Sequence, residues 1–178
     1  AGDDDISNNY YLGLCYLRSQ ETGALWKAHE RLRHALELSR GSNPVILGQL
    51  GMLRCQIGQA EEGMANIREA ITKLQPEPQL LTSLWRTLGE TYTMLRDFKA
   101  ALPCYEKVAE LNPKQPKWLY QIAYTHYMLH DDKNEERYTR RFVEAVKQSG
   151  EEQKYTKLLS EAEERLKALK AERFFRGE

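Results

Sequence analysis

The segment between residues 85 and 113 decides the fold, and it reads WRTLGETYTMLRDFKAALPCYEKVAELNP. Four of its residues lie at positions i, i+3, i+4 and i+7, the spacing of one helix face, namely Trp85, Leu88, Gly89 and Tyr92. A second helical face begins at Ala101, and Pro113 stands where that helix is expected to end and the next turn to begin. The segment therefore predicts a hairpin of two antiparallel helices.

The rest of the chain repeats this helical periodicity. No Asn-Gly or Asp-Gly turn joins two alternating stretches, and β-branched residues never cluster as they do in strands. Apolar blocks of helical spacing are separated instead by Gly, Pro, Asn and Asp. The predicted helices cover residues 6–18, 24–39, 44–57, 60–74, 79–95, 98–111, 116–129, 133–149 and 151–174. The sequence thus predicts an all-α fold of antiparallel helix hairpins.

The residues of the deciding segment also carry a family signature. Trp85, Leu88, Gly89 and Tyr92 are followed by Ala101, Tyr105 and Pro113, which matches the pattern W-x2-L-G-x2-Y, A-x3-F and P with Tyr in place of Phe. The chain therefore resembles the tetratricopeptide-repeat (TPR) family over about residues 6–149. The resemblance implies a TPR superhelix, a solenoid in which each hairpin leaves an apolar edge that its neighbour covers.

Three other units fall into phase with this repeat. Their matching residues are Asn9, Leu12, Gly13 and Tyr16, then Leu47, Leu50, Gly51 and Arg54, and finally Leu119, Ile122, Ala123 and His126. We expect a polar N-terminal tail at residues 1–5, four hairpins at about 6–40, 44–75, 82–113 and 116–149, and a C-terminal capping or docking helix within 151–178.

The C-terminal segment has one apolar stripe, formed by Tyr155, Leu158, Leu159, Ala162, Leu166 and Leu169. A cap that shields the last repeat explains the first half of this helix. The second half, with Phe174 and Phe175 beyond the last hairpin, suits a docking or dimerisation surface. Both interpretations stay open at this point.

Composition and motifs exclude several functions. Lys plus Arg and Asp plus Glu balance at 26 each, which argues against a nucleic-acid partner, and no apolar run is long enough for membrane insertion. No phosphate-binding glycine loop or serine-hydrolase elbow occurs, so we expect no enzyme activity and no cofactor. Cys15, Cys55 and Cys104 are expected to be buried thiols, which favours the cytoplasm.

Histidines offer the one alternative site. His29 and Glu30 begin an HExxH pattern, but Arg33 replaces its second histidine. His126 and His130 are spaced i, i+4 and could hold a transition metal. A structural role is preferred, because His126 occupies a packing position of the repeat and His130 ends its helix. We therefore predict no metal site.

The TPR resemblance places a partner in the concave groove, which the first helix of each hairpin lines. The residues that follow the signature positions by one form a second stripe on each first helix, which we expect to face the groove. This stripe includes Gly48 and Cys55. The expected partner-binding residues are its members Tyr10, Leu14, Leu17, Met52, Arg86, Glu90, Tyr120, Tyr124 and Tyr127, together with Lys117 at its border. We expect at least one of Tyr124 and Tyr127 to pack against a neighbouring helix or the cap instead. Tyrosines offer rigid apolar area and a hydroxyl to a partner.

One TPR subclass binds acidic C-terminal tails through Lys, Asn and Arg side chains, but Tyr10, Leu14, Ser83 and Thr87 stand in those places. The expected partner segment is therefore apolar or aromatic. The predicted function is a non-enzymatic scaffold or adaptor that binds a partner protein or peptide. The alternatives are a chaperone or assembly factor for an apolar client, and a protein that self-assembles, for example as a homo-oligomer through its C-terminal helix.

Overall fold

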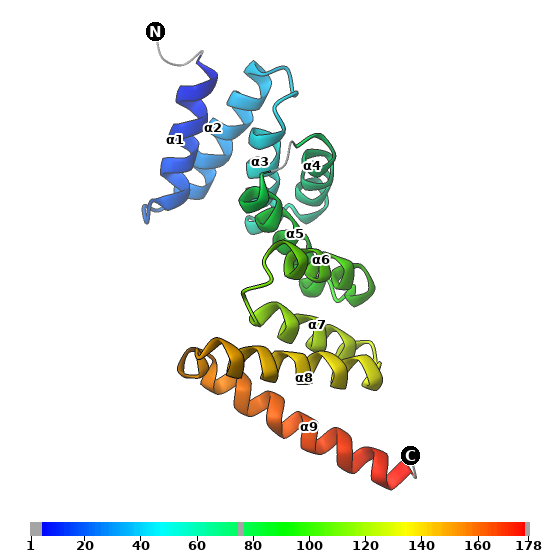
Figure 1. The fold of residues 1–178 in the computed structure, drawn as a ribbon. Helices are drawn as coiled ribbons and strands as arrows, with labels where there is room; N and C mark the ends of the chain where they lie inside the picture. The colour runs from blue at the N-terminus through cyan, green and yellow to red at the C-terminus, as the bar shows by residue number, and fades with distance from the viewer. Residues whose placement is uncertain (1–4, 75–76, 177–178) are drawn as a thin grey trace. The chain divides into compact units, whose positions relative to one another are not determined.

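The computed structural model describes residues 5–74 and 77–176 (Figure 1), so most of the expected N-terminal tail and part of the linker at residues 75–76 lie outside the described residues. The chain divides into two compact units, residues 1–91 and 92–178, with the division inside one helix. The elements of the first are α1 (Ile6–Arg18), α2 (Ala24–Leu38), α3 (Pro44–Gln56), α4 (Ala60–Lys73) and most of α5 (Pro78–Met94). Those of the second are the end of α5, α6 (Phe98–Leu111), α7 (Lys117–Met128), α8 (Asp132–Ser149), the 3-10 turn η1 (Glu152–Tyr155) and α9 (Thr156–Arg176).

Helix ends lie at or next to the predicted residues for the first eight helices. Side-chain caps explain several of the starts. The Asp5 carboxylate accepts from the Asn8 amide at 2.8 Å, and the Asn43 side chain accepts from the amides of Val45 and Ile46 at 3.0 and 3.3 Å. Such caps satisfy amides that have no partner within their helix. The prediction of one helix over 151–174 is wrong in its first turn, which is a separate 3-10 turn before α9.

Glycines set the spacing of α3 and α4. A Cβ atom at Gly51 would lie 2.9 Å from the Gly63 carbonyl oxygen, and one at Gly63 would lie 2.6 Å from Cys55 Sγ and 2.7 Å from the Gly51 oxygen. The two helices therefore approach more closely than any side chain at these positions allows. Gly13 has the same role in α1, where a Cβ would lie 2.9 Å from Leu32 Cγ. In both hairpins of residues 1–91, the glycine of the repeat pattern therefore lies where the second helix approaches closely.

Polar residues that replace apolar ones in the repeat pattern are bonded to the second helix of their hairpin. Asn9 is buried, and its side-chain oxygen accepts a hydrogen bond from Arg31 Nη1 at 3.1 Å. Arg54 donates from Nη1 to the Asn66 side-chain oxygen at 2.6 Å. A buried polar group without a hydrogen-bond partner destabilises the fold. A polar residue in the first helix of a hairpin therefore needs a partner residue on the second helix of that hairpin.

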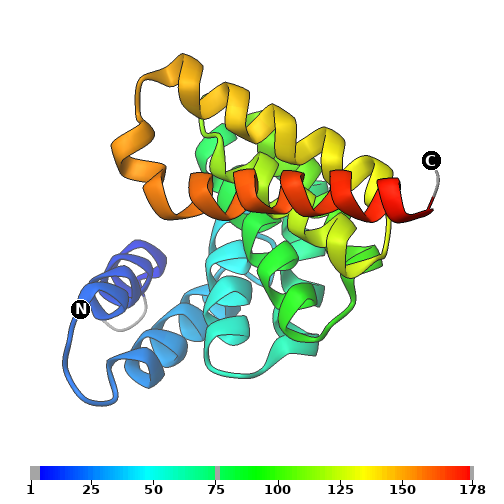
Figure 2. The ribbon, with the colours of Figure 1, turned by 90° about the horizontal axis from the view of Figure 1, so that it is seen from below.

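In the second unit, α9 lies along α8 (Figure 2), and the two helices share a core. Its buried residues are Phe142, Val143, Val146, Tyr155 and Ala162, and Leu119, Tyr120, Leu158, Leu159 and Leu166 pack against them. The apolar stripe predicted for the C-terminal segment is therefore the face that α9 turns toward α7 and α8. Phe174 and Phe175 lie outside this core and are 79% and 86% exposed.

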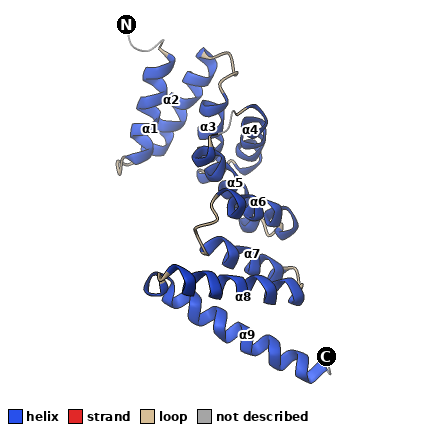
Figure 3. Cartoon of the chain, in the orientation of Figure 1, coloured by secondary structure: helices blue, strands red, loops and turns tan. Residues whose placement is uncertain are grey.

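The described residues form helices and connecting turns without any β-strand (Figure 3). Within residues 5–74 and 77–176, every helix is too short or too polar to cross a membrane. Cys15, Cys55 and Cys104 lie outside any disulfide. Cys55 and Cys104 are buried as expected, but the expectation for Cys15 is wrong, because its position on the outer side of α1 leaves it exposed.

Candidate partner-binding surface

The predicted groove residues in the first unit are largely used for packing. Tyr10 and Leu17 are half-buried and pack against the core formed by Ala28, Leu32, Leu50 and Leu53. Leu14 and Met52 are also half-buried. Arg86 and Glu90 lie one turn apart on α5, with Nε and Oε1 at 3.9 Å, which is a weak surface ion pair.

Two residues of the predicted stripe do not belong to an open surface. Gly48 is buried, and a Cβ added to it would lie 3.1 Å from Leu84 Cδ2 of α5. Cys55 is buried beside Gly63, and burial raises the pKa of its thiol. The close approach of neighbouring helices leaves these two positions no access to solvent, so their expected place in the groove was wrong.

The tyrosines of α7 form the largest cluster of predicted residues that the structure brings together. Tyr124 and Tyr127 are 40% and 47% exposed, with ring centroids 6.4 Å apart. Tyr120 is half-buried, and its ring meets the edge of Phe142 at a centroid distance of 5.3 Å. Lys117 begins the helix, and its ammonium lies 4.3 Å from the centre of the Trp118 ring. Of the three tyrosines, Tyr120 contributes to the core and the other two remain open to solvent.

Helix α9 supplies the other side of this surface. The Tyr120 hydroxyl donates to Glu161 Oε2 at 2.8 Å, and the Arg165 guanidinium lies 5.0 Å from the centre of the Tyr127 ring. Burial, together with the hydrogen bond to Glu161, raises the pKa of Tyr120 to about 12. The hydroxyl therefore remains a donor throughout the physiological pH range.

A pocket of about 200 Å³ lies between α7, α8 and α9. It is lined by Tyr120, Ala123, Tyr124, Tyr127, Glu135, Thr139, Glu161, Ala162 and Arg165. We refer to it as the tyrosine pocket. The lining consists of aromatic faces and two small alanines, with charged groups contributed by α8 and α9.

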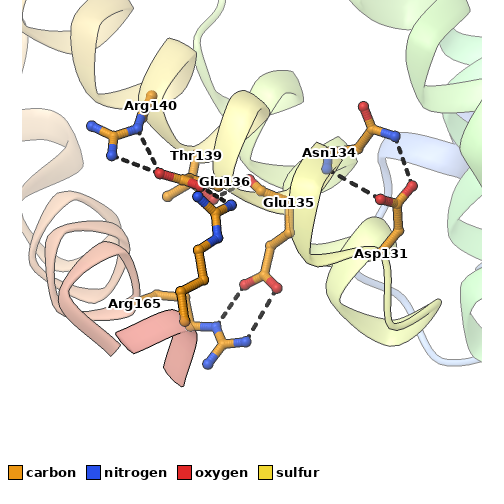
Figure 4. Close-up of polar contacts among 8 residues, drawn as sticks. Asp131, Asn134, Glu135, Glu136, Thr139, Arg140 and Arg165 are labelled. Carbon is orange, nitrogen blue, oxygen red and sulfur yellow. Dashed lines mark hydrogen bonds and ion pairs between the residues drawn. The ribbon is translucent and has the colours of Figure 1, made fainter. Parts of the chain in front are cut away.

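An ion pair between Glu135 of α8 and Arg165 of α9, both of which line the tyrosine pocket, joins these two helices (Figure 4). The Glu135 side chain is only 3% exposed, and its two oxygens accept from Arg165 Nε and Nη2 at 2.6 and 3.2 Å. Arg165 also donates to Glu172 at 2.9 Å. The hydrogen bonds that Arg165 donates to the Glu135 carboxylate are the main reason why the pKa of Arg165 is raised. This bidentate pair holds α9 in one position against α8.

Sequence reasoning did not identify Glu135 or Arg165, although a signal was present. Glu135, Tyr138 and Phe142 are spaced i, i+3 and i+7, so the acid lies on the buried face of α8. Arg165 has the same spacing relative to Ala162 and Leu169 in the stripe of α9. Because buried charges are paired, an acid on one apolar stripe and a base on the next predict a contact.

The histidine pair of α7 has a structural explanation. His126 is buried and stacks on Tyr138, with ring centroids 5.5 Å apart, and its Nδ1 lies 3.2 Å from Asp131 Oδ2. Asp131 also caps α8 by accepting from the Asn134 amide at 3.1 Å. His130 has a positive φ of 57° in the turn between the helices. Across the described part of the chain, no three His, Cys, Asp or Glu side chains are grouped to hold a metal ion.

Comparison with known proteins identifies the fold. A structure of MamA residues 41 to the end from Desulfovibrio magneticus RS-1 is 19% identical, with a TM-score of 0.71 over 99% of this chain and 94% of that one. The C-terminal part of a TPR repeat-containing protein from Cytophaga hutchinsonii is 19% identical, with a TM-score of 0.72 over 94% of this chain and 62% of that one. A chain of the APC/C hetero-tetramer Cut9-Hcn1 is 19% identical, with a TM-score of 0.68 over 88% of this chain and 30% of that one.

A search of curated proteins found no match. The family described as tetratricopeptide repeat matches residues 6–148, which is most of the chain. The predicted all-α helix-hairpin fold is therefore confirmed. By the match over these residues, the chain belongs to the tetratricopeptide-repeat family.

Proposed function

We propose that this chain is a non-enzymatic interaction module, a scaffold or adaptor that binds a segment of a partner protein. The single observation that carries the proposal is the exposed pair Tyr124 and Tyr127 in the lining of the tyrosine pocket. Neither ring belongs to the core that joins α7, α8 and α9. Large aromatic rings that do not pack into the core are the side chains that most often supply binding energy at interfaces.

The arrangement favours an adaptor over a chaperone that shields an apolar client. Both exposed tyrosines carry hydroxyl groups, and charged side chains of Glu161 and Arg165 border them. A client-shielding surface requires a broader apolar area than two rings. Cut9, a protein of the same fold, is found in a hetero-tetramer with Hcn1, which is an example of a TPR chain in a protein complex. The cytoplasm remains a prediction, supported by three cysteines outside any disulfide.

The proposal is tested with the partner captured by affinity purification of the full chain, followed by titration calorimetry with that purified partner. Replacing both rings in a Tyr124→Ala/Tyr127→Ala variant is expected to weaken binding about tenfold or more, the scale of interface hot spots. Tyr11→Ala is the matched control, because Tyr11 is a 64% exposed tyrosine on α1. Equal affinities for the wild type and the double variant would disprove the proposed surface.

Self-association is the second candidate, favoured by the exposed side chains of Phe174 and Phe175. Their rings lie 5.9 Å apart at the end of α9 and form an apolar patch. Sedimentation velocity at several protein concentrations tests this function. A concentration-dependent dimer that disappears in a Phe174→Ser/Phe175→Ser variant would support it, and a monomer at every concentration would exclude it.

A further inference from the structure

We propose that the tyrosine pocket receives a single basic side chain, lysine or arginine, from the partner segment. The inference rests on the proposed function, because it names the chemistry of the partner at that same surface. Its basis is the combination of pocket size, aromatic walls and the unbalanced charge of the lining.

The size of the pocket selects the kind of ligand. Its volume of about 200 Å³ is below the range of about 300–1,000 Å³ that is typical of pockets for small molecules and cofactors. One long side chain fits such a space, and the backbone that carries it would remain outside. The pocket is therefore suited to an anchor residue of a protein segment.

The walls of the pocket favour a cation. Tyr124 and Tyr127, which are 40% and 47% exposed, line the pocket, and the face of an aromatic ring attracts an ammonium or guanidinium group. Arg165 shows this geometry within the chain itself, since its guanidinium lies 5.0 Å from the centre of the Tyr127 ring. Ala123 and Ala162 add apolar surface against which the methylene groups of lysine or arginine can pack.

The charges of the lining leave one negative group in excess. Glu135 and Arg165 neutralise each other, and Arg165 also bonds to Glu172. Glu161 is different, because its side chain is 44% exposed. It accepts one hydrogen bond from Tyr120, while Lys157 Nζ lies 3.9 Å away on a solvent-exposed side chain.

A carboxylate can accept about four hydrogen bonds, so Glu161 retains acceptor sites for an incoming donor. An acidic side chain would instead meet the negative charge of Glu161. Arg165 would bind that acidic side chain only weakly, because its guanidinium is already paired with the carboxylates of Glu135 and Glu172. The lining therefore distinguishes basic from acidic side chains.

The test uses the full chain and short model peptides in an NMR titration. The probe is acetyl-Gly-Ser-Arg-Ser-Gly-amide, and its neutral counterpart carries citrulline, which has the shape of arginine without the charge. A third peptide carries glutamate. We expect the arginine peptide to bind roughly 3–10-fold more tightly than the citrulline peptide, from one cation–π contact and one exposed ion pair. The shifted signals should include the methyl groups of Ala123 and Ala162.

Two matched variants test whether the carboxylate of Glu161 causes the preference for arginine over citrulline. Glu161→Gln keeps an acceptor for Tyr120 but removes the carboxylate, so the preference for arginine over citrulline should be lost. Glu164→Gln makes the same change at an exposed position of α9 outside the lining, and the preference should remain.

Equal affinity for arginine and citrulline, tighter binding of glutamate, or no binding at millimolar concentration would each overturn the inference. So would signal shifts that map outside the pocket. If the Tyr124→Ala/Tyr127→Ala variant still loses its natural partner under those outcomes, the proposed function stands and only the basic anchor is rejected.

Discussion

Two regions of this chain solve the packing of helices in different ways. In the first unit, α3 and α4 touch at Gly51 and Gly63, where a Cβ atom would lie within 3 Å of the facing helix. In the second, α8 and α9 are joined beside an apolar core by an ion pair of the buried Glu135 with Arg165. The first contact depends on the absence of side chains, and the second depends on two long side chains that must meet.

The difference bears on function. The glycine contact of α3 with α4 leaves no room for a side chain at Gly51 or Gly63. The contact of α9 with α7 and α8 encloses a pocket and leaves two tyrosines exposed. A binding surface needs side chains that do not pack into the core. Of the two contacts compared, the contact of α9 with α7 and α8 leaves such side chains, and the contact of α3 with α4 does not.

The largest effect is expected from breaking the ion pair. Arg165→Leu leaves Glu135 buried without its base, which should lower the free energy of unfolding by about 3 kcal/mol. Urea denaturation followed by circular dichroism measures the change. Lys167→Leu on the exposed side of α9 is the control and should change stability by less than about 0.5 kcal/mol.

A double variant sharpens this test. Glu135→Leu/Arg165→Leu removes both charges together, and it should recover much of the lost stability, because the cost lies in the uncompensated charge. A double variant no more stable than Arg165→Leu alone would show that the pair contributes through packing and not through charge.

An intermediate effect is expected from filling the glycine contact. Gly63→Ala places a methyl group against the backbone of α3, which cannot move aside as a flexible side chain can. Alanine improves helix propensity by about 1 kcal/mol, but overpacking should outweigh this gain and leave a net loss of about 1–3 kcal/mol. Thermal unfolding measures it, with Ala65→Leu on the exposed face of α4 as control. Unchanged stability in Gly63→Ala would contradict the close approach of α3 and α4.

The smallest effect concerns pH in the second unit. Arg140 donates to Glu136 from Nε at 3.0 Å and from Nη2 at 2.6 Å, and Arg173 of α9 contacts the same carboxylate. Hydrogen bonding from Arg140 is the main cause of a Glu136 pKa below its usual 4.5. Because the pKa is lower in the folded state, the stabilisation is present above about pH 4.5 and is lost as pH falls through the folded value.

Glu136→Gln should therefore cost about 0.5–1 kcal/mol at pH 7 and progressively less toward pH 3. Urea midpoints measured across this range for the variant and the wild type give the difference. Glu144→Gln, at an exposed position of α8, serves as the control. A cost that stays constant with pH would show that the ionised form of Glu136 has no special role.

The sequence was informative where the repeat signature constrains geometry. Gly13 and Gly51 stand in the glycine place of the repeat pattern, and the structure puts both at close contacts between helices. The apolar stripe of the last helix was likewise visible from its spacing, and Tyr155, Ala162 and Leu169 are buried. These features depend on local periodicity, which one chain segment contains by itself.

The candidate site was less accessible from the sequence, because it depends on how separate helices meet. The rotation that selected Tyr124 and Tyr127 also selected Gly48 and Cys55, which are buried. Periodicity assigns a residue to a face but does not state how closely the next helix covers that face. Arg165 reaches the pocket from a helix 30 residues beyond Glu135, and only the folded chain shows this contact.

The unequal exposure of the three thiols has a practical consequence. Cys15 is open to solvent, while Cys104 is buried and Cys55 is both buried and raised in pKa. Since thiolates react with maleimides and burial blocks them, a fluorescent dye should attach to the native chain at Cys15 alone. Such a label would report on the unfolding of residues 1–91 without any engineered cysteine, and delayed labelling of the other two would time the opening of their helices.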